Sequence, residues 1–316
     1  MPKFARLFPI IIPLLASRTH TIEKSAGVMQ KIADYAAFSK LRLASLVVFS
    51  AVIGYFIACR QLQIEMNWLR LMALTIGGFL ITAASNGFNQ VIERDTDKLM
   101  TRTQNRPLPT GKMSVNEGII LASVMGIAGI LLLFLFTNPL SGILGAAALV
   151  LYTLVYTPLK KITPFAVFVG AFPGAAPAML GWVAATNGFG MIGTMALLLF
   201  AIQFMWQFPH FWAIAWVQHE DYKRAGFHLL PSPGGRDKSS AFQVVIYTLV
   251  LLPVSLSPVL FQISGSIAAV IIFATGFLFL IQALKLFRDC EVRSASRLMF
   301  GSFIYLPVVQ LALLFG

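Results

Sequence analysis

Long runs of apolar residues, separated by short polar segments, follow one another along most of the chain. Each run is about 20 residues long, which is the length an α-helix needs to cross the apolar core of a bilayer. None shows the strict alternation of apolar and polar residues that is typical of a half-buried strand. The pattern therefore predicts an all-α, polytopic membrane protein with about nine transmembrane helices. They are expected at roughly 43–59, 68–91, 117–136, 139–157, 162–185, 190–215, 241–263, 267–287 and 298–316.

The first forty residues do not follow this pattern. Phe8–Ala16 is apolar but short, and it contains Pro9 and Pro13, so we do not expect it to span the membrane. A failed signal sequence and a segment lying at the membrane surface both stay open as interpretations. We accordingly divide the chain into an N-terminal cytoplasmic extension, residues 1–38, and a membrane domain, residues 39–316.

The composition supports a membrane protein. The chain of 316 residues is 58% hydrophobic and only 11% charged, whereas soluble domains average about 45–50% apolar and about 25% charged residues. Cys59 and Cys290 lie far apart and form no metal or redox motif. The net charge of +12 would indicate a nucleic-acid partner in a soluble protein. Here the basic residues lie between apolar runs, so we expect a lipid bilayer as the partner and no nucleic acid.

Lysine and arginine alternate strongly between successive loops. Only two of the 24, Arg60 and Arg70, follow the first predicted helix, and the loops after the third, fifth and seventh contain none. All the others precede the first helix or follow an even-numbered one. By the positive-inside rule, the N-terminus and the basic loops are cytoplasmic and Gly316 lies outside. The loops after the second and sixth helices are the long ones, about 25 residues each, and long loops commonly carry function.

The second predicted helix ends in a polar stripe. Asn89, Glu93 and Asp97 are spaced four residues apart and therefore lie within about 80° of one another on a helix. An amide at the depth of Asn89 would be costly against lipid, so this face should line a cavity. Two carboxylates and an amide are hard oxygen ligands of the kind that Mg²⁺ prefers. Cations able to bind phosphate oxygens follow in the next loop, at Arg102, Arg106 and Lys112.

A simpler interpretation of this segment is a helix end with solvated acids. Polar residues that enter the membrane on one face and lead into arginines favour a binding site instead. Asp95 lies near the opposite face if the helix continues, so its role depends on where the helix unwinds.

The sixth predicted helix carries a second polar stripe and leads into the other long basic loop. Pro209 should kink this helix, because it lacks an amide hydrogen and its ring clashes with the preceding turn. His210 alone would fit an interhelical hydrogen bond, but two stripes that end in acids on the same side of the membrane favour a shared cavity. The residues of the second stripe project within about 80° of one another: Gln203, Gln207, His210, Gln218 and Asp221.

This arrangement suits the ionisation of an allylic diphosphate. A divalent metal and cations would stabilise the departing diphosphate, and a dry aromatic cavity would protect the carbocation from water. Such chemistry needs no protein nucleophile. A transporter with polar residues along a midplane path is the alternative from another class, although here the acids gather at one side of the membrane.

At these residues the chain resembles the UbiA-type intramembrane prenyltransferases. Asn89-x-x-x-Glu93-x-x-x-Asp97, followed by Arg102-Thr-Gln-Asn-Arg106-Pro, looks like the first Asp-rich motif of that family. Most members have Asp at the positions of Gln90 and Glu93, and the form found here is similar to the branch that farnesylates haem. Segments that also look like this branch are Ser39-Lys-Leu-Arg42, Tyr156-Thr-Pro-Leu-Lys-Lys161, Phe208-Pro-His-Phe-Trp-Ala-Ile-Ala215 and Asp221-Tyr-Lys-Arg-Ala-Gly226.

The chain departs from the family pattern in its second motif. Position 225, four residues after Asp221, is Ala where the family has a second acid. One metal-binding carboxylate is then missing, or Glu220 substitutes for it.

The resemblance implies nine helices around a central cavity and a reaction in which farnesyl diphosphate ionises and its C1 adds to a vinyl group of haem B. Water would then convert the product cation to the hydroxyl of haem O. Partners implied in a bacterial inner membrane are haem A synthase and terminal oxidase assembly. Prenylation of an aromatic quinone precursor is the alternative within the same class.

The resemblance also assigns roles to residues. His210 is the candidate for contact with haem, at the iron or at a propionate. The implied Mg²⁺ ligands are Asn89, Glu93, Asp97 and Asp221. The implied diphosphate-binding residues are Arg102, Arg106, Lys161 and Lys40.

Overall fold

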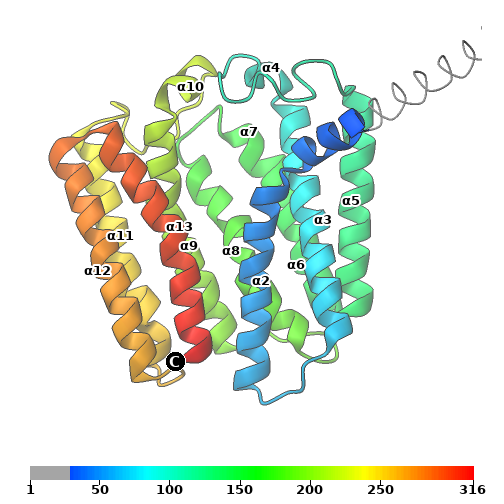
Figure 1. Ribbon diagram of the computed structural model, residues 1–316, viewed down its shortest axis with the longest axis vertical. Coiled ribbons are helices and arrows are strands. Elements are labelled where there is room, and N and C mark those ends of the chain that lie inside the picture. Colours follow the sequence, from blue (N-terminus) through cyan, green and yellow to red (C-terminus); the bar gives the residue numbers. More distant parts are fainter. Residues whose placement is uncertain (1–28) are drawn as a thin grey trace, which may run out of the picture.

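The computed structural model describes residues 29–316, which are helical apart from the connecting turns and loops (Figure 1). Nine helices in this part of the chain are long and apolar enough to cross a membrane. Each coincides with one predicted run, and the prediction of a nine-helix, all-α membrane protein is confirmed. The largest difference is at the last helix, which begins at Val292 rather than 298. The spanning helices are α2 (Leu41–Gln61), α3 (Trp68–Ile92), α5 (Val115–Phe136), α6 (Pro139–Val150) with its continuation η1 (Leu151–Tyr156) and α7 (Thr157–Leu159), α8 (Ala166–Ala185), α9 (Thr194–Val217), α11 (Lys238–Leu260), α12 (Ser266–Asp289) and α13 (Val292–Phe315).

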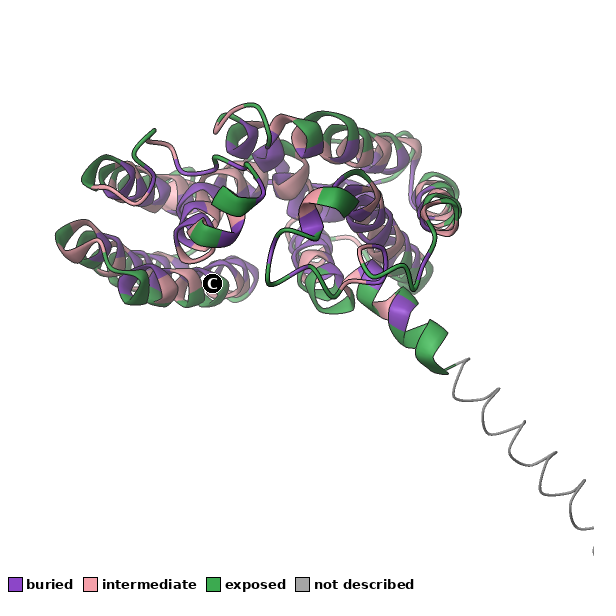
Figure 2. Ribbon diagram, turned by 90° about the horizontal axis from the view of Figure 1, so that it is seen from above, coloured by how far each residue is buried: buried purple, intermediate pink, exposed green. Residues whose placement is uncertain are grey.

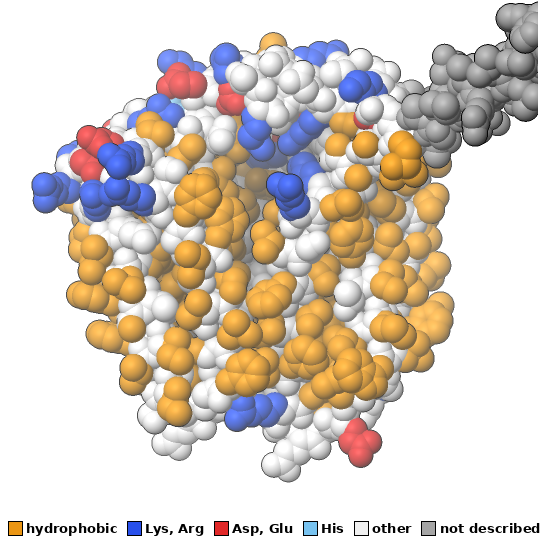
Figure 3. All heavy atoms as spheres, in the orientation of Figure 1, with side chains coloured by type: hydrophobic (Ala, Val, Ile, Leu, Met, Phe, Trp, Pro, Cys, Tyr) orange, Lys and Arg blue, Asp and Glu red, His pale blue; other side chains and the backbone are white. Residues whose placement is uncertain are grey.

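Two short helices continue the second and sixth spans. α4 (Arg94–Asp97) follows α3, and α10 (His219–Arg224) follows α9. Both lie at the same end of the bundle as α7, the upper end in Figure 1, which we call the basic end. Figure 3 shows Lys and Arg side chains gathered at this end and hydrophobic side chains covering the middle of the bundle. Seen from above, the exposed residues lie around the perimeter and the buried faces turn inward (Figure 2).

Small residues allow the helices around the site to approach closely, as is common in membrane bundles. A methyl group at Gly54 of α2 would overlap the carbonyl oxygen of Ala178 on α8, and one at Gly181 of α8 would overlap that of Ala51. At Gly174 it would overlap the side chain of Gln207 on α9. Glycine therefore sets the spacing of α2, α8 and α9.

The predicted boundary near residue 38 falls inside a packed helix. Residues 29–39 are helical, and the Tyr35 hydroxyl donates to Glu117 Oε1 at the start of α5, at 2.7 Å. Phe38 is fully buried against Leu108 and Met113. The rest of the predicted extension, with its apolar segment Phe8–Ala16, lies outside the described residues.

Candidate active site

A cavity of about 430 Å³ lies inside the bundle at the basic end. In Figure 3 it is seen as a hollow between α2 and α13, with Lys and Arg side chains at its upper edge. Residues from both predicted stripes line it, so the structure brings the ends of α3 and α9 to one cavity. The polar residues of the lining are Lys40, Ser50, Thr82, Ser85, Asn86, Asn89, Glu93, Asp97, Arg102, Arg106, Lys160, Gln203, Gln207 and His210, with the hydroxyls of Tyr152, Tyr156 and Tyr222.

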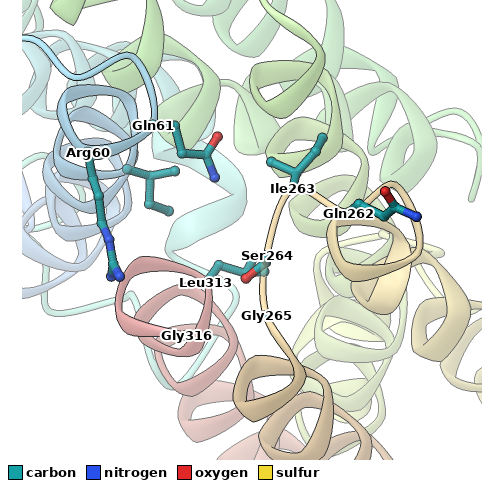
Figure 4. Close-up of a pocket in the computed structure, with 9 residues that line it drawn as sticks. Arg60, Gln61, Gln262, Ile263, Ser264, Gly265, Leu313 and Gly316 are labelled. Carbon is teal, nitrogen blue, oxygen red and sulfur yellow. The ribbon is translucent and has the colours of Figure 1, made fainter.

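A smaller hollow of about 320 Å³ lies at the opposite end of the bundle, among the end of α2, the α11–α12 turn and the end of α13 (Figure 4). Arg60 is the only charged side chain among the described residues that line it. Its guanidinium donates to the carbonyl oxygen of Leu314. Carboxylates and several cations meet in the central cavity, which we take as the candidate active site.

The acidic stripe keeps its predicted spacing although α3 ends before the stripe does. The Glu93 amide donates to Asn89 O at 2.9 Å, and the Asp97 amide donates to Glu93 O at 2.7 Å, so the helical repeat continues into α4. Asn89, Glu93 and Asp97 are all buried and line the cavity. Asp95 lies away from it, with its side chain 70% exposed and paired with Lys98. The local break at Glu93 thus leaves the metal-binding candidates on one face.

Each carboxylate of the stripe is held by a cation. Lys160 Nζ lies 2.6 Å from Glu93 Oε1, and Arg106 Nη1 lies 2.7 Å from Asp97 Oδ2. Both acids are buried. Removing one partner of such a pair leaves a desolvated charge, which typically costs about 3–5 kcal/mol. These pairs therefore fix the positions of the two carboxylates relative to the two cations.

A π-helical turn, η1, positions Lys160. The Thr157 amide donates to Tyr152 O, five residues back, instead of four. Pro158 explains the wider turn, because in regular α spacing its ring would clash with the carbonyl group four residues earlier. Turns of this kind are frequent at functional sites. The Thr157 hydroxyl donates to Tyr152 O at 2.8 Å and accepts from Asn89 Nδ2 at 3.3 Å, which ties the turn to the acidic stripe.

Sequence reasoning selected Lys161 and missed its neighbour. Lys161 is exposed and does not line the cavity, whereas Lys160 is buried within it. The Lys160 ammonium also lies over the rings of Tyr156 and Phe227, at 4.9 and 5.6 Å from their centroids. The spacing offered a signal: Lys160 follows Thr157 by three residues and Tyr156 by four, so the three share a helix face.

Lys40 reaches the cavity from the junction before α2. Its backbone is left-handed, with φ 48°, which a non-glycine residue adopts at some cost. Its ammonium donates to Asn86 Oδ1 at 3.3 Å. Burial, together with the positive charges of Arg106 and Lys160, lowers the pKa of Lys40 to about 7.

Asp221 holds two loops together instead of lining the cavity. Its carboxylate accepts from the backbone amides of Thr101 and Arg102, each at 3.2 Å, and from the Arg224 guanidinium. Burial opposes ionisation, but the bonds from Arg102, Arg224 and Thr101 outweigh it and hold the pKa of Asp221 below its ordinary value. Glu220, the alternative acid, has a 69% exposed side chain and pairs with Arg236 at 3.2 Å.

His210 lies in the α9 wall of the cavity, stacked on Trp206 with the ring centroids 4.4 Å apart. Its Nδ1 lies 2.7 Å from the Ser302 hydroxyl of α13. That hydroxyl donates its own hydrogen to Met299 O at 2.5 Å, so it accepts from His210. We therefore assign a proton to Nδ1, which in the neutral imidazole leaves the lone pair on Nε2.

The glutamines of the second stripe anchor α9 to α8. Gln203 Nε2 donates to Gly174 O and Gln207 Nε2 to Ala171 O, both at 2.9 Å. Gln218 is the C-cap residue that follows α9, and it does not line the cavity. The predicted stripe thus divides into a part that faces the cavity and a part, Gln218 and Asp221, that does not.

The residues present fit a hard divalent cation. Asn89, Glu93 and Asp97 supply amide and carboxylate oxygens, and Asp97 Oδ1 is fully buried with no hydrogen-bond partner among the described residues. In that part of the chain, no three His, Cys, Asp or Glu side chains converge into a complete metal site. Mg²⁺ usually completes its coordination with water and substrate phosphates, so an incomplete protein shell is what it needs.

Carboxylates and cations at one end of an apolar, aromatic cavity are the arrangement that an intramembrane prenyltransferase requires. The UbiA prenyltransferase family is matched by residues 47–306, and the chain belongs to this family. Membership confirms the predicted enzyme class and sets aside the transporter interpretation.

Curated relatives cover nearly the whole chain. The chain is 49% identical to Protoheme IX farnesyltransferase of Cytophaga hutchinsonii over 278 residues, which are 88% of this chain and 95% of the relative. It is 47% identical to the protein of the same name from Flavobacterium psychrophilum over 283 residues, which are 88% of this chain and 92% of the relative.

Solved structures share the fold at low sequence identity. A digeranylgeranylglyceryl phosphate synthase aligns with a TM-score of 0.74 and 21% identity, covering 91% of this chain and 98% of that one. A UbiA homologue from Archaeoglobus fulgidus, bound to GPP and Mg²⁺, aligns with a TM-score of 0.62 and 14% identity, covering 89% and 99%.

Proposed function

We propose that the chain transfers the farnesyl group of farnesyl diphosphate to a vinyl group of haem B, giving haem O and diphosphate. The observation that carries this proposal is the identity of 44–49% to several relatives named Protoheme IX farnesyltransferase. The site supports it, because the cavity combines a charged end with a long apolar interior.

Asn89, Glu93 and Asp97 would hold Mg²⁺, which stabilises the charge of a departing diphosphate when it is bound. Arg102 and Arg106 would bind the diphosphate oxygens, since guanidinium groups match their geometry. Two ammonium groups would complete this binding: Lys40, and Lys160 in the place that sequence reasoning gave to Lys161. Asp221 would act indirectly, by holding the backbone that precedes Arg102.

The C1–O bond of farnesyl diphosphate would break with both electrons leaving on the diphosphate. The π electrons of the haem vinyl group would then form the new bond to C1. Water would add to the resulting cation and lose a proton, leaving the hydroxyl group of haem O. The cavity walls, which include Tyr152, Tyr156, Trp206 and Phe211, keep other water from the first cation.

His210 is placed to contact the haem acceptor. It lies seven residues before Val217, where α9 ends at the basic end, which is about 10 Å along an ideal helix, so the imidazole lies deeper in the bundle than the charged end and leaves room between them for a large planar acceptor. With Nδ1–H donated to Ser302, Nε2 is free to ligate the haem iron. We propose this contact in preference to one with a propionate, for which a neutral imidazole offers little charge.

We also propose that the basic end faces the cytoplasm, with residues 1–38 on that side and Gly316 outside. The positive-inside rule supports this, since Arg60 and Arg70 are the only lysines or arginines of residues 29–316 that lie at the opposite end. A reporter fused after Lys112 or Arg236 should read cytoplasmic, and one after Asn187 should read external. A cytoplasmic reading at Asn187 would overturn this orientation.

We further propose that haem A synthase or terminal oxidase assembly receives the haem O.

The function is tested by extracting pigments from membranes that contain the expressed chain, supplied with farnesyl diphosphate and haem B. Haem O, identified by mass and retention, should accumulate with the wild-type chain and not with Asp97→Asn. Prenylation of an aromatic carboxylic acid, with no haem O, would instead favour a quinone precursor as the acceptor.

A further inference from the structure

The acids best placed to hold a metal are already neutralised by cations of the chain itself. Lys160 holds Glu93 at 2.6 Å and Arg106 holds Asp97 at 2.7 Å. The exposed fractions of these four side chains are 10, 5, 17 and 0% respectively, so little water screens the pairs. A metal bound to these carboxylates would stand next to both cations, and like charges at such separations repel strongly when buried.

The charge of the whole cavity also opposes the binding of a metal ion on its own. Among residues 29–316, two carboxylates line it, against four cationic side chains: Lys40, Arg102, Arg106 and Lys160. The cavity therefore carries excess positive charge, reduced only by the lowered pKa of Lys40. A divalent cation alone would add to this excess, whereas a diphosphate would reverse it.

We propose that Lys160 and Arg106 are internal counterions of the free site, and that metal binding depends on the diphosphate for this reason. When a diphosphate arrives, the two cations transfer their bonds to its oxygens and leave Glu93 and Asp97 to the metal. The inference rests on the proposed function, because it requires a prenyl diphosphate as the substrate.

The surroundings of Lys160 allow this exchange. Its ammonium group is on a flexible four-carbon stem with three donors, so it can change partners without moving the backbone. The rings of Tyr156 and Phe227 lie under the ammonium at 4.9 and 5.6 Å and can retain the cation as it leaves Glu93. Lys161 has the same charge one residue later but is exposed and outside the cavity.

The test is equilibrium binding of Mn²⁺, followed by electron paramagnetic resonance, to the purified full chain without diphosphate. Wild type should bind Mn²⁺ weakly, and Lys160→Met should bind it at least ten times more tightly. Lys161→Met removes the same charge from the surface and should match wild type. Lys160→Arg keeps a cation near Glu93, so its Mn²⁺ affinity should also match that of wild type. Arg106→Gln, which releases the other acid, provides an independent variant should Lys160→Met fold poorly.

A second measurement separates this inference from the proposed function. Wild type should retain radiolabelled inorganic diphosphate better with Mg²⁺ than without it. If it does so, while Lys160→Met and Arg106→Gln bind Mn²⁺ no better than Lys161→Met, the counterion role is wrong and the function stands. If wild type retains no diphosphate under either condition, the proposed function fails together with the inference.

Discussion

Asp97 and Asp221 occupy similar places, each just beyond a spanning helix at the basic end and each paired with an arginine, but only Asp221 also binds backbone amides. Asp97 is fully buried, pairs with the Arg106 side chain and lines the cavity. Asp221 lies outside the lining and accepts from two backbone amides as well as from the Arg224 guanidinium. A side-chain cation can leave its partner when a ligand arrives, whereas an amide of a folded loop cannot. The first acid is therefore available to a ligand, and the second is committed to structure.

This difference bears on the missing second acid at Ala225. If the α10 segment served as a second metal site, its loss of a carboxylate would be hard to reconcile with activity. If Asp221 instead fixes the loop that leads to Arg102, one carboxylate is sufficient, because both of its oxygens are used on Thr101 and Arg102. The contrast between the two segments can be tested by measuring turnover and the Mg²⁺ dependence of diphosphate retention in a variant of each acid.

The largest effect is expected at the cavity acids. Glu93→Gln and Asp97→Asn should each lower turnover by about 100-fold or more, the usual loss when a group that stabilises developing charge is removed. Retention of diphosphate should lose its dependence on Mg²⁺ in both variants. The assay is haem O formation beside diphosphate binding. Near-normal activity of either variant would mean that the acidic stripe is structural.

A smaller and different effect is expected for Asp221→Asn. The substitution weakens the hydrogen bonds that the amides of Thr101 and Arg102 donate, which should lower the free energy of unfolding by about 1–3 kcal/mol. The melting temperature and turnover should fall, but diphosphate retention should still increase with Mg²⁺. Loss of that Mg²⁺ dependence, as in Asp97→Asn, would make Asp221 a metal ligand and would remove the contrast between the two acids.

His210→Ala should reduce haem O formation about tenfold or more, while farnesyl diphosphate affinity changes little, because the basic end of α9 is about 10 Å away along the helix. Ser302→Ala is the matched variant: it removes the partner of Nδ1 without removing the imidazole. It should lower activity less than His210→Ala does. Equal losses of haem O formation and of diphosphate affinity in His210→Ala would mean that His210 only supports the helix.

The nine helices could be predicted because membrane spans depend on local composition, and every backbone polar group must be satisfied within its own helix. The cavity-facing positions Asn89, Glu93 and Asp97 could be predicted from helical periodicity alone. The same reasoning placed Asp221 beside the cavity, because it assumed that α9 continues without interruption. In the structure α9 ends at Val217, and α10 begins again at His219.

The partners of the acids could not be predicted. The pairing of Arg106 with Asp97 depends on how the long loop folds back, and that of Lys160 with Glu93 depends on the π turn at η1. A one-residue difference in register decides between Lys160 and Lys161. Sequence spacing indicates which residues share a helix face, but it does not say where a widened turn will shift that face.

Lys40 should make diphosphate binding depend on pH. In the free site its pKa is lowered to about 7 by burial and by the charges of Arg106, Lys160 and Arg102, which outweigh the opposing effect of Glu93. A bound diphosphate favours the charged amine and raises this pKa, so binding takes up a proton wherever the free amine is neutral. The dissociation constant should then rise by up to about tenfold per pH unit above pH 7 and level off below pH 6.

The measurement is farnesyl diphosphate affinity from pH 6 to 8.5 without haem, a range in which the substrate's own charge changes mainly near pH 6. Lys40→Met should bind more weakly at pH 6 and lose the dependence above pH 7, while Lys161→Met should keep it. If the wild-type affinity is the same at pH 7 and 8.5, Lys40 is not the titrating group in the diphosphate site.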